Sequence, residues 1–204
     1  MAITTNAQLE TAIGNWMDRD DLSARIPEFV ALAEARFNRI LRAPDMLTRD
    51  DAFVVDGQYE TLPPGFIEPK RIVLLTSPVT PLEYVTPEVM ADLRIGRTAS
   101  GKPIYYTVTG GNLEFFPTPD SAYTASVLYY TRLTANAVSE NWLFASHPDI
   151  YLWGALVAAE AYIRNDERLG IWKQQLDEGI SELNRLSDRK STPGASRPRT
   201  GGFE

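Results

Sequence analysis

The sequence of 204 residues contains no cysteine and only one histidine, His147. Without cysteine the chain has no disulfide, no thiolate nucleophile, no iron–sulfur cluster and no Cys-ligated zinc. With one histidine it has no multi-histidine metal site, and a Ser-His-Asp triad would have to use His147. These two scarcities exclude several large classes of enzyme before any motif is considered.

A surplus of positive charge is also absent. The chain has 20 Lys and Arg against 27 Asp and Glu, a formal net charge of −7, and each third of it is mildly acidic. Proteins that bind duplex DNA need a basic surface that displaces counterions from the phosphates. We therefore expect no sequence-specific binding of nucleic acid.

Long apolar runs are missing as well. The longest extends from Ile150 to Ile163, is interrupted by Glu160, and is shorter than the roughly 20 residues that span a bilayer. The N-terminal residues have neither the basic segment nor the apolar segment of a signal peptide. We expect a soluble cytoplasmic or virion protein that makes no membrane contact.

The common catalytic and nucleotide-binding motifs do not occur: there is no P-loop, no G-x-G-x-x-G, no G-x-S-x-G and no H-E-x-x-H. Glu160 stands out as a lone acid in an apolar segment. Burial would raise its pKa unless a cation such as Arg36 or Arg164 meets it. Nothing marks a catalytic pair, so we expect no enzyme, no cofactor and no metal.

Helical periodicity occupies both ends of the chain. Residues 5–18 form a predicted helix that Thr5 or Asn6 can cap, and a second predicted helix covers 22–42, with Pro27 near its start. Toward the C-terminus, Ser146-x-x-Asp149 is a capping-box pattern that opens a predicted helix over 150–164. A last predicted helix covers 166–189. The four helices can bury their apolar stripes only against one another, so we expect one bundle.

The middle of the chain has the short apolar runs and turn residues of β structure. Strands are predicted at 48–55, 58–62, 71–75, 82–85, 104–109, 113–116 and 122–132. Asp56-Gly57 predicts one hairpin and Gly110-Gly111-Asn112 a second, because these residues tolerate a positive φ. A short helix is predicted from a Thr86 cap through Leu93, with Pro87 at its first position.

These elements predict an α+β chain in which a helical bundle carries an inserted antiparallel β subdomain. Residues 1–46 would supply the N-terminal helices of the bundle, 47–134 the β-rich insert and 135–190 the C-terminal helices. Residues 191–204 lack aliphatic core formers and are expected to be a flexible tail.

Several stretches, in this order, resemble one protein family. They are residues 29–42, 62–68, 82–87, 105–117 and 129–130, then Trp142-Leu143 and 147–156. The layout resembles the head-to-tail adaptor, or connector, proteins of tailed bacteriophages, including those called tail tubular protein A in short-tailed phages. The likeness extends over most of residues 25–175.

The resemblance implies a structural virion protein at the head–tail junction, assembled in the host cytoplasm. Such adaptors form a homo-oligomeric ring, commonly of twelve copies, beneath the portal protein. The ring extends the DNA channel, through which the genome passes without sequence-specific binding, and offers a docking face to tail or nozzle proteins. No catalytic residue, cofactor or metal is implied.

The resemblance also gives possible contact residues. In relatives the C-terminal segment often reaches into the portal, which would assign portal binding to Arg197, Arg199 and Phe203 of the basic tail. The two predicted hairpin tips would contact neighbouring subunits or the tail; their residues are Asp56, Gly57, Gly110, Gly111 and Asn112.

Other interpretations remain open on the sequence. The C-terminal segment could be merely solvated. The chain could be another phage neck or tail-completion protein of similar build. A carbohydrate-active enzyme or lectin that uses exposed acids and tyrosines is the alternative from a different class, although no pair of carboxylates is marked out.

Overall fold

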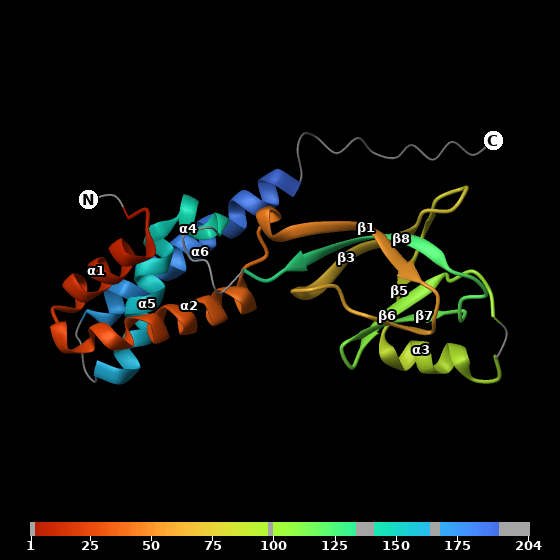
Figure 1. The fold of residues 1–204 in the computed structure, drawn as a ribbon, viewed down its shortest axis with the longest axis horizontal. Coiled ribbons are helices and arrows are strands. Elements are labelled where there is room, and N and C mark those ends of the chain that lie inside the picture. Colours follow the sequence, from red (N-terminus) through yellow and green to blue (C-terminus); the bar gives the residue numbers. More distant parts are fainter. Residues whose placement is uncertain (1–2, 98–99, 134–140, 164–167, 192–204) are drawn as a thin grey trace. The chain divides into compact units, whose positions relative to one another are not determined.

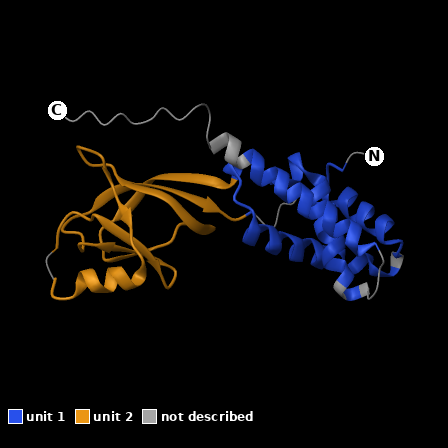
Figure 2. Ribbon diagram, turned by 180° about the vertical axis from the view of Figure 1, so that it is seen from behind, with its two compact units in different colours: residues 1–45, 133–204 blue, residues 46–132 orange. Residues whose placement is uncertain are grey.

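The computed structural model describes residues 3–97, 100–133, 141–163 and 168–191. The chain divides into two compact units, one made of residues 1–45 and 133–204 and the other of residues 46–132 (Figure 2). We call them the helical unit and the β unit and describe each separately. Apart from Ser191, the last residue of the final helix, the predicted tail with Arg197, Arg199 and Phe203 lies outside the described residues.

The helical unit begins with α1 (Asn6–Met17), which has the predicted Thr5 cap. The Thr5 hydroxyl accepts a hydrogen bond from the Gln8 N–H, and the Gln8 side chain bonds back to the Thr5 backbone. The second predicted helix begins later than expected, because Asp20–Arg25 forms a 3₁₀ turn and α2 covers Ile26–Ile40. Pro27 then lies in the first turn of α2, where its missing N–H costs nothing.

Three helices follow in the C-terminal part of this unit: α4 (Trp142–Ser146), α5 (Pro148–Ile163) and α6 (Leu169–Ser191). The sequence analysis missed α4. Ser146 is its last residue, and α5 begins two residues before the predicted start at residue 150. The cap that the structure shows is Asn141, whose side chain accepts from the Phe144 N–H at 2.9 Å.

Helix α5 is the central helix of this unit, as its apolar sequence predicts. It packs against α1, α2, α4 and α6 (Figure 1). At Gly154 it approaches α2 so closely that a Cβ there would lie 2.5 Å from Cζ of Phe37 and 3.1 Å from Cβ of Ala33. A glycine at this crossing therefore sets the separation of the two helices.

The β unit contains two four-stranded sheets. Sheet A has the order β1 (Leu47–Val55), β8 (Tyr123–Thr131), β3 (Phe66–Leu74), β4 (Thr80–Pro81). Sheet B has the order β2 (Tyr59–Thr61), β7 (Asn112–Phe116), β6 (Tyr105–Thr109), β5 (Glu83–Tyr84). All pairings are antiparallel except that of β5 with β6.

The two sheets enclose the core of the β unit. Alternate residues of sheet A point inward and meet inward residues of sheet B; the set includes Val55, Ile72, Leu74, Ala125 and Val127 from sheet A, and Tyr106, Leu113 and Phe115 from sheet B. The opposite face of sheet B carries Thr107, Glu114 and Phe116, which are also buried. Helix α3 (Pro87–Arg94) packs on β6 and β7 and covers that face, so the unit has three layers (Figure 1).

One of the two predicted hairpins is wrong. Strands β1 and β2 lie in different sheets, and Asp56-Gly57 carries the chain from sheet A to sheet B. The Asp56 and Gly57 N–H groups donate to the Glu60 carboxylate at 3.1 and 2.7 Å. Asp56-Gly57 does form a turn, as predicted, but β1 pairs with the nine-residue strand β8 and not with β2, its short neighbour in sequence.

The other hairpin is confirmed. Strands β6 and β7 pair in register from Tyr105 opposite Phe116 to Thr109 opposite Asn112, and the turn is Gly110-Gly111 with φ of 59° and 83°. The predicted strand at 82–85 corresponds to the shorter β5 of sheet B, and the preceding two-residue strand β4 of sheet A was not predicted. Helix α3 has the predicted Thr86 cap. The predicted α+β class is confirmed.

Candidate assembly surfaces

The structure separates the sequence-predicted contact residues of the β unit into two settings. Gly110 and Gly111 are exposed at the tip of the β6–β7 hairpin, and Asn112 is the first residue of β7. Asp56 and Gly57 are tied to Glu60 in the crossover between the sheets. Only the first group therefore forms a hairpin tip.

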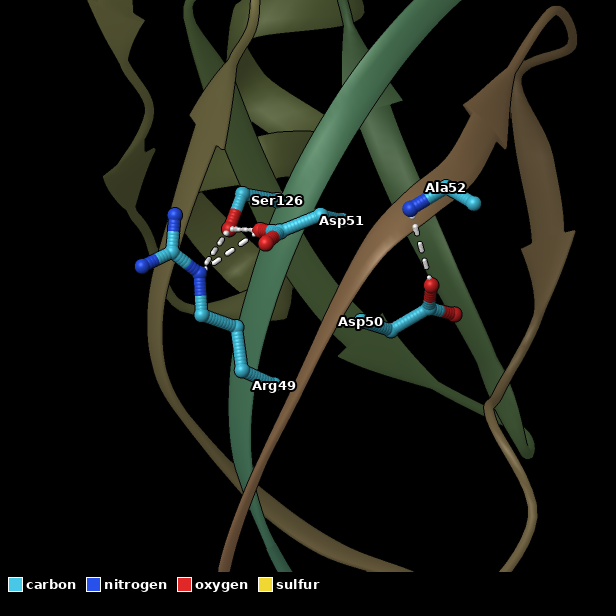
Figure 3. Close-up of polar contacts among 5 residues, drawn as sticks. All are labelled: Arg49, Asp50, Asp51, Ala52 and Ser126. Carbon is cyan, nitrogen blue, oxygen red and sulfur yellow. Dashed lines mark hydrogen bonds and ion pairs between the residues drawn. The ribbon is translucent and has the colours of Figure 1, made fainter.

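A charged cluster occupies sheet A where β1 bulges (Figure 3). The register of β1 against β8 shifts between Asp50 and Phe53. Nε of Arg49 donates to Oδ1 of Asp51 at 2.6 Å and to Oγ of Ser126 at 3.1 Å, and the Ser126 hydroxyl donates to the same carboxylate. Asp50 turns away from the cluster and accepts from the Ala52 N–H at 2.9 Å, which stabilises the bulge.

These contacts fix the charge of the cluster. The hydrogen bond from Ser126 and then the bond from Arg49 hold the pKa of Asp51 below its ordinary value. Asp51 is thus a carboxylate at neutral pH and orients the Arg49 guanidinium. The arrangement positions a cation on the sheet, and it places no second acid beside Asp51 for proton transfer.

Around this cluster the outer face of sheet A, the face that points away from sheet B, exposes apolar side chains. Val54, Leu75 and Val79 are 49%, 43% and 60% exposed. Val79 lines a shallow groove on this face with half-buried Val73 and Leu128, and Arg49, Arg71 and Ser126 complete its lining. Single exposed apolar residues are ordinary, but a group of them on one face indicates a contact surface.

The hairpin loop that carries Leu75 and Val79 is held by polar contacts. The Thr76 hydroxyl donates to the Pro78 carbonyl at 2.8 Å. Nζ of Lys102 donates to the hydroxyls of Thr76 at 2.7 Å and Thr80 at 2.5 Å. The loop therefore presents its two apolar residues in one conformation.

Helix α3 has a second outward surface. Met90 points into the β unit, whereas Val89 and Ile95 are 45% and 76% exposed on the other side, beside Glu88 and Asp92. We call Glu88, Val89, Asp92 and Ile95 the α3 face. Hydrogen bonds from its own backbone N–H and from the Thr86 hydroxyl lower the pKa of Glu88, so the α3 face is anionic at neutral pH.

A clamp fixes α3 on sheet B. Nε of Arg94 donates to Oε1 of Glu114 at 2.6 Å, and Nη2 donates to the Phe115 carbonyl at 2.7 Å. The guanidinium also lies 5.3 Å from the centre of the Phe116 ring. Arg94 thus faces inward and adds no charge to the α3 face.

The helical unit has its own buried polar network. The Tyr151 hydroxyl donates to Oε1 of Glu34 at 3.0 Å and accepts from Nδ2 of Asn141 at 2.5 Å. Burial raises the pKa of Glu34, although the Tyr151 hydrogen bond opposes the shift, and burial raises the pKa of Tyr151 as well. The network joins α2, α5 and the cap of α4.

Glu160, the lone acid of the apolar helix, is buried as its position in the sequence suggests. Of the two expected cations, Arg36 pairs instead with Asp177 of α6 at 3.2 Å, and Arg164 lies outside the described residues. Across the described part of the chain, no group of three or more His, Asp or Glu is arranged to hold a metal ion. None of the described helices is long and apolar enough to cross a membrane.

The sequence analysis missed both the outer face of sheet A and the α3 face. A signal was present in the alternation of the strands and in the 88-92-95 spacing of the short helix. This pattern alone could not identify the exposed faces. Which face of a strand points outward depends on the strands that it pairs with, and these come from distant parts of the chain.

Comparison with known protein families gives a match over nearly the whole chain. Residues 4–199 match the model of the family described as SU10 adaptor protein. No curated protein matches the chain. The match includes both the helical unit and the β unit and confirms the adaptor resemblance seen in the sequence. The chain therefore belongs to the SU10 adaptor protein family, a family of phage head-to-tail adaptors.

Proposed function

We propose that this adaptor assembles as a ring of identical copies, twelve in number, between the portal protein and the tail proteins of a phage particle, and that the ring extends the channel through which the genome leaves. The family match over residues 4–199 carries the proposal. An overall acidic chain supports a channel role, because a net charge of −7 does not retain DNA phosphates.

Within this proposal the C-terminal segment contacts the portal. Arg197 and Arg199 would pair with carboxylates, and Phe203 would fill an apolar pocket. Because every copy in a ring carries the segment, weak individual contacts add through effective concentration. Gly110, Gly111 and Asn112 at the hairpin tip, and Asp56 and Gly57 at the crossover, are proposed to contact neighbouring copies or tail proteins.

The test uses the full-length chain and particles that carry the portal but no adaptor. We expect cryo-electron microscopy to show added density of closed rotational symmetry at the portal vertex. An Arg197→Ala, Arg199→Ala, Phe203→Ala triple variant is expected to keep its far-UV circular dichroism and to lose most portal binding. A chain that neither binds the portal vertex nor forms closed oligomers would overturn the proposal and favour a different neck or tail-completion role.

A further inference from the structure

The two outward surfaces of the β unit lie on opposite sides of its three layers. Sheet B separates them, because its inner side chains share a core with sheet A and its outer side chains lie beneath α3 (Figure 1). A closed ring of identical subunits needs two different surfaces on each copy, which meet head to tail. The β unit has such a pair of surfaces.

Their charges are opposite. The outer face of sheet A carries Arg49 and Arg71 beside Leu128, and Lys70, whose Nζ lies 6.0 Å from the centre of the Tyr130 ring. Asp51 is paired with Arg49 and Ser126, so the charges of Arg49 and Asp51 offset each other and the positive charge of this face comes from Arg71 and Lys70. The residue of β3 opposite Tyr130 is Glu68. The α3 face carries negative charge.

On the α3 face the charged residues are Glu88 and Asp92, while Arg94 is turned inward to Glu114. In a chain of net charge −7 most surface pairings repel. The cationic face of sheet A is where an acidic surface of a second copy can approach with favourable electrostatics.

Their apolar residues also match in kind. Val54, Leu75 and Val79 protrude from one surface, and Val89 and Ile95 from the other. Both surfaces are held before any contact forms, one by the Lys102 contacts and the other by the Arg94 clamp. Surfaces fixed in advance lose little side-chain and loop entropy on association.

We propose that the outer face of sheet A in one copy docks on the α3 face of the next copy, and that this is a subunit contact of the ring. The inference rests on the proposed function, because it assigns the surfaces by which the ring closes. Leu75 and Val79 pack against Val89 and Ile95, while Arg71 faces Asp92.

The absence of cysteine allows a direct test by cross-linking. A full-length Leu75→Cys, Ile95→Cys variant is expected to give a ladder of covalent oligomers with a short bis-maleimide. The two cysteines lie on opposite sides of one β unit, so a link between them joins two copies. Each single variant, and a Leu75→Cys, Ile104→Cys control that pairs Leu75 with an exposed residue outside the α3 face, are expected to give no ladder.

Charge reversal supplies a second readout. Arg71→Glu and Asp92→Arg are each expected to lower the association constant about tenfold, because an attractive contact becomes repulsive. The double variant, which exchanges the two charges, is expected to recover most of the loss. Glu83→Arg, a reversal of an exposed acid on β5 that belongs to neither of the two defined surfaces, serves as the matched control and is expected to change little.

The outcomes separate this inference from the proposed function. If the wild-type chain forms rings, yet the cross-linked ladder is absent and the reversals have no effect, the inference is overturned and the ring stands. If the reversals leave the ring intact but abolish binding of tail proteins, the surface belongs to a tail partner and the inference is again overturned. If the wild-type chain never assembles, alone or on the portal, both the proposed ring and the proposed subunit contact are overturned.

Discussion

Glu34 is a buried acid, and its raised pKa makes the stability of the helical unit depend on pH. The native state holds the Glu34 proton to higher pH than the unfolded state, whose pKa is near 4.5. Between that pH and the raised native pKa the native state binds more protons, so the free energy of unfolding falls as pH rises. The contribution of protonated Glu34 to the free energy of unfolding is complete below the pKa of the unfolded state. It is lost above the pKa of the native state.

A Glu34→Gln variant isolates this contribution. Glutamine keeps an oxygen that can accept from Tyr151 but cannot ionise. We expect the stability of the variant relative to wild type to increase with pH above about 4.5, in urea titrations followed by tryptophan fluorescence. All four tryptophans lie in the helical unit, so the signal reports that unit. A difference that is flat with pH would show that the pKa of Glu34 is the same in the native and unfolded states.

The hydroxyl of Thr107 is buried under α3 and has no hydrogen-bond partner in the described structure. Valine has nearly the same shape and an equally strong preference for strands. Thr107→Val is therefore expected to stabilise the β unit by about 1 kcal/mol, because an unpaired polar group is removed. Hydrogen exchange of β6 and β7 amides measures the change; slower exchange is expected, and faster exchange would contradict it.

Residue-scale features were predictable where they depend on adjacent residues. Thr86 was identified as a cap, and Thr5 as one of two candidates beside Asn6, because a hydroxyl followed by the first helical turn is enough. Asn141 was missed although its bond to the Phe144 N–H is equally local, because the short helix α4 was not predicted. Tyr151, the hydrogen-bond partner of Glu34, lies 117 positions away in the sequence, and no local sequence pattern predicts such a contact.

Between helices α2 and α5, Gly154 is required by the close approach of Phe37. Gly154→Ala would gain roughly 1 kcal/mol of helix propensity, yet overpacking in a tight core costs about 1–3 kcal/mol. We expect net destabilisation, seen as a lower urea midpoint by tryptophan fluorescence. Gly170→Ala in α6 is the matched control, because a Cβ there meets nothing within 4 Å, and it should be neutral or slightly stabilising.

Helix α3 depends on the Arg94–Glu114 pair for its attachment. Arg94→Ala is expected to destabilise the β unit by about 3 kcal/mol, because it leaves a buried carboxylate with reduced compensation. An Arg94→Met, Glu114→Leu double variant should lose less than the single variant. Hydrogen exchange of α3 and β7 amides gives the measurement, and a double variant that loses more than Arg94→Ala would disprove this account.

Element-scale prediction succeeded for helix type and for the Gly110-Gly111 hairpin, whose strands are neighbours in both sequence and sheet. It failed at Asp56-Gly57, where the same kind of turn leads into a second sheet. The difference lies in the partner: β1 finds β8, more than sixty residues away, and the longer pairing buries more apolar surface. Turn chemistry specifies a change of direction but not the strand that is paired afterwards.

For the whole molecule, the sequence predicted the α+β class and the family resemblance. It did not predict the paired surfaces of the β unit, because these arise only after strands from both ends of the insert join one sheet. The portal-binding assignment of Arg197, Arg199 and Phe203 stays a prediction from resemblance.

The opposite charges of the proposed subunit contact would make assembly of the proposed ring sensitive to salt. The screening length falls from about 10 Å at 0.1 M salt to about 3 Å at 1 M, so the association constant is expected to fall as salt is added. Sedimentation velocity of the full-length chain measures this. The Arg71→Glu variant should show a weaker or reversed dependence, and an association that strengthens with salt in the wild-type chain would indicate a purely apolar contact.

The β unit begins and ends on neighbouring strands of one sheet, with Leu47 of β1 opposite Tyr130 of β8. Because its two ends are adjacent, the β unit is an insert that can be replaced as one piece. It can be lengthened, trimmed or exchanged for another between residues 45 and 133 while the helices on either side keep their connection. Replacing one contiguous stretch of gene, the codons of residues 46–132, would thus change the surfaces of the whole β unit at once.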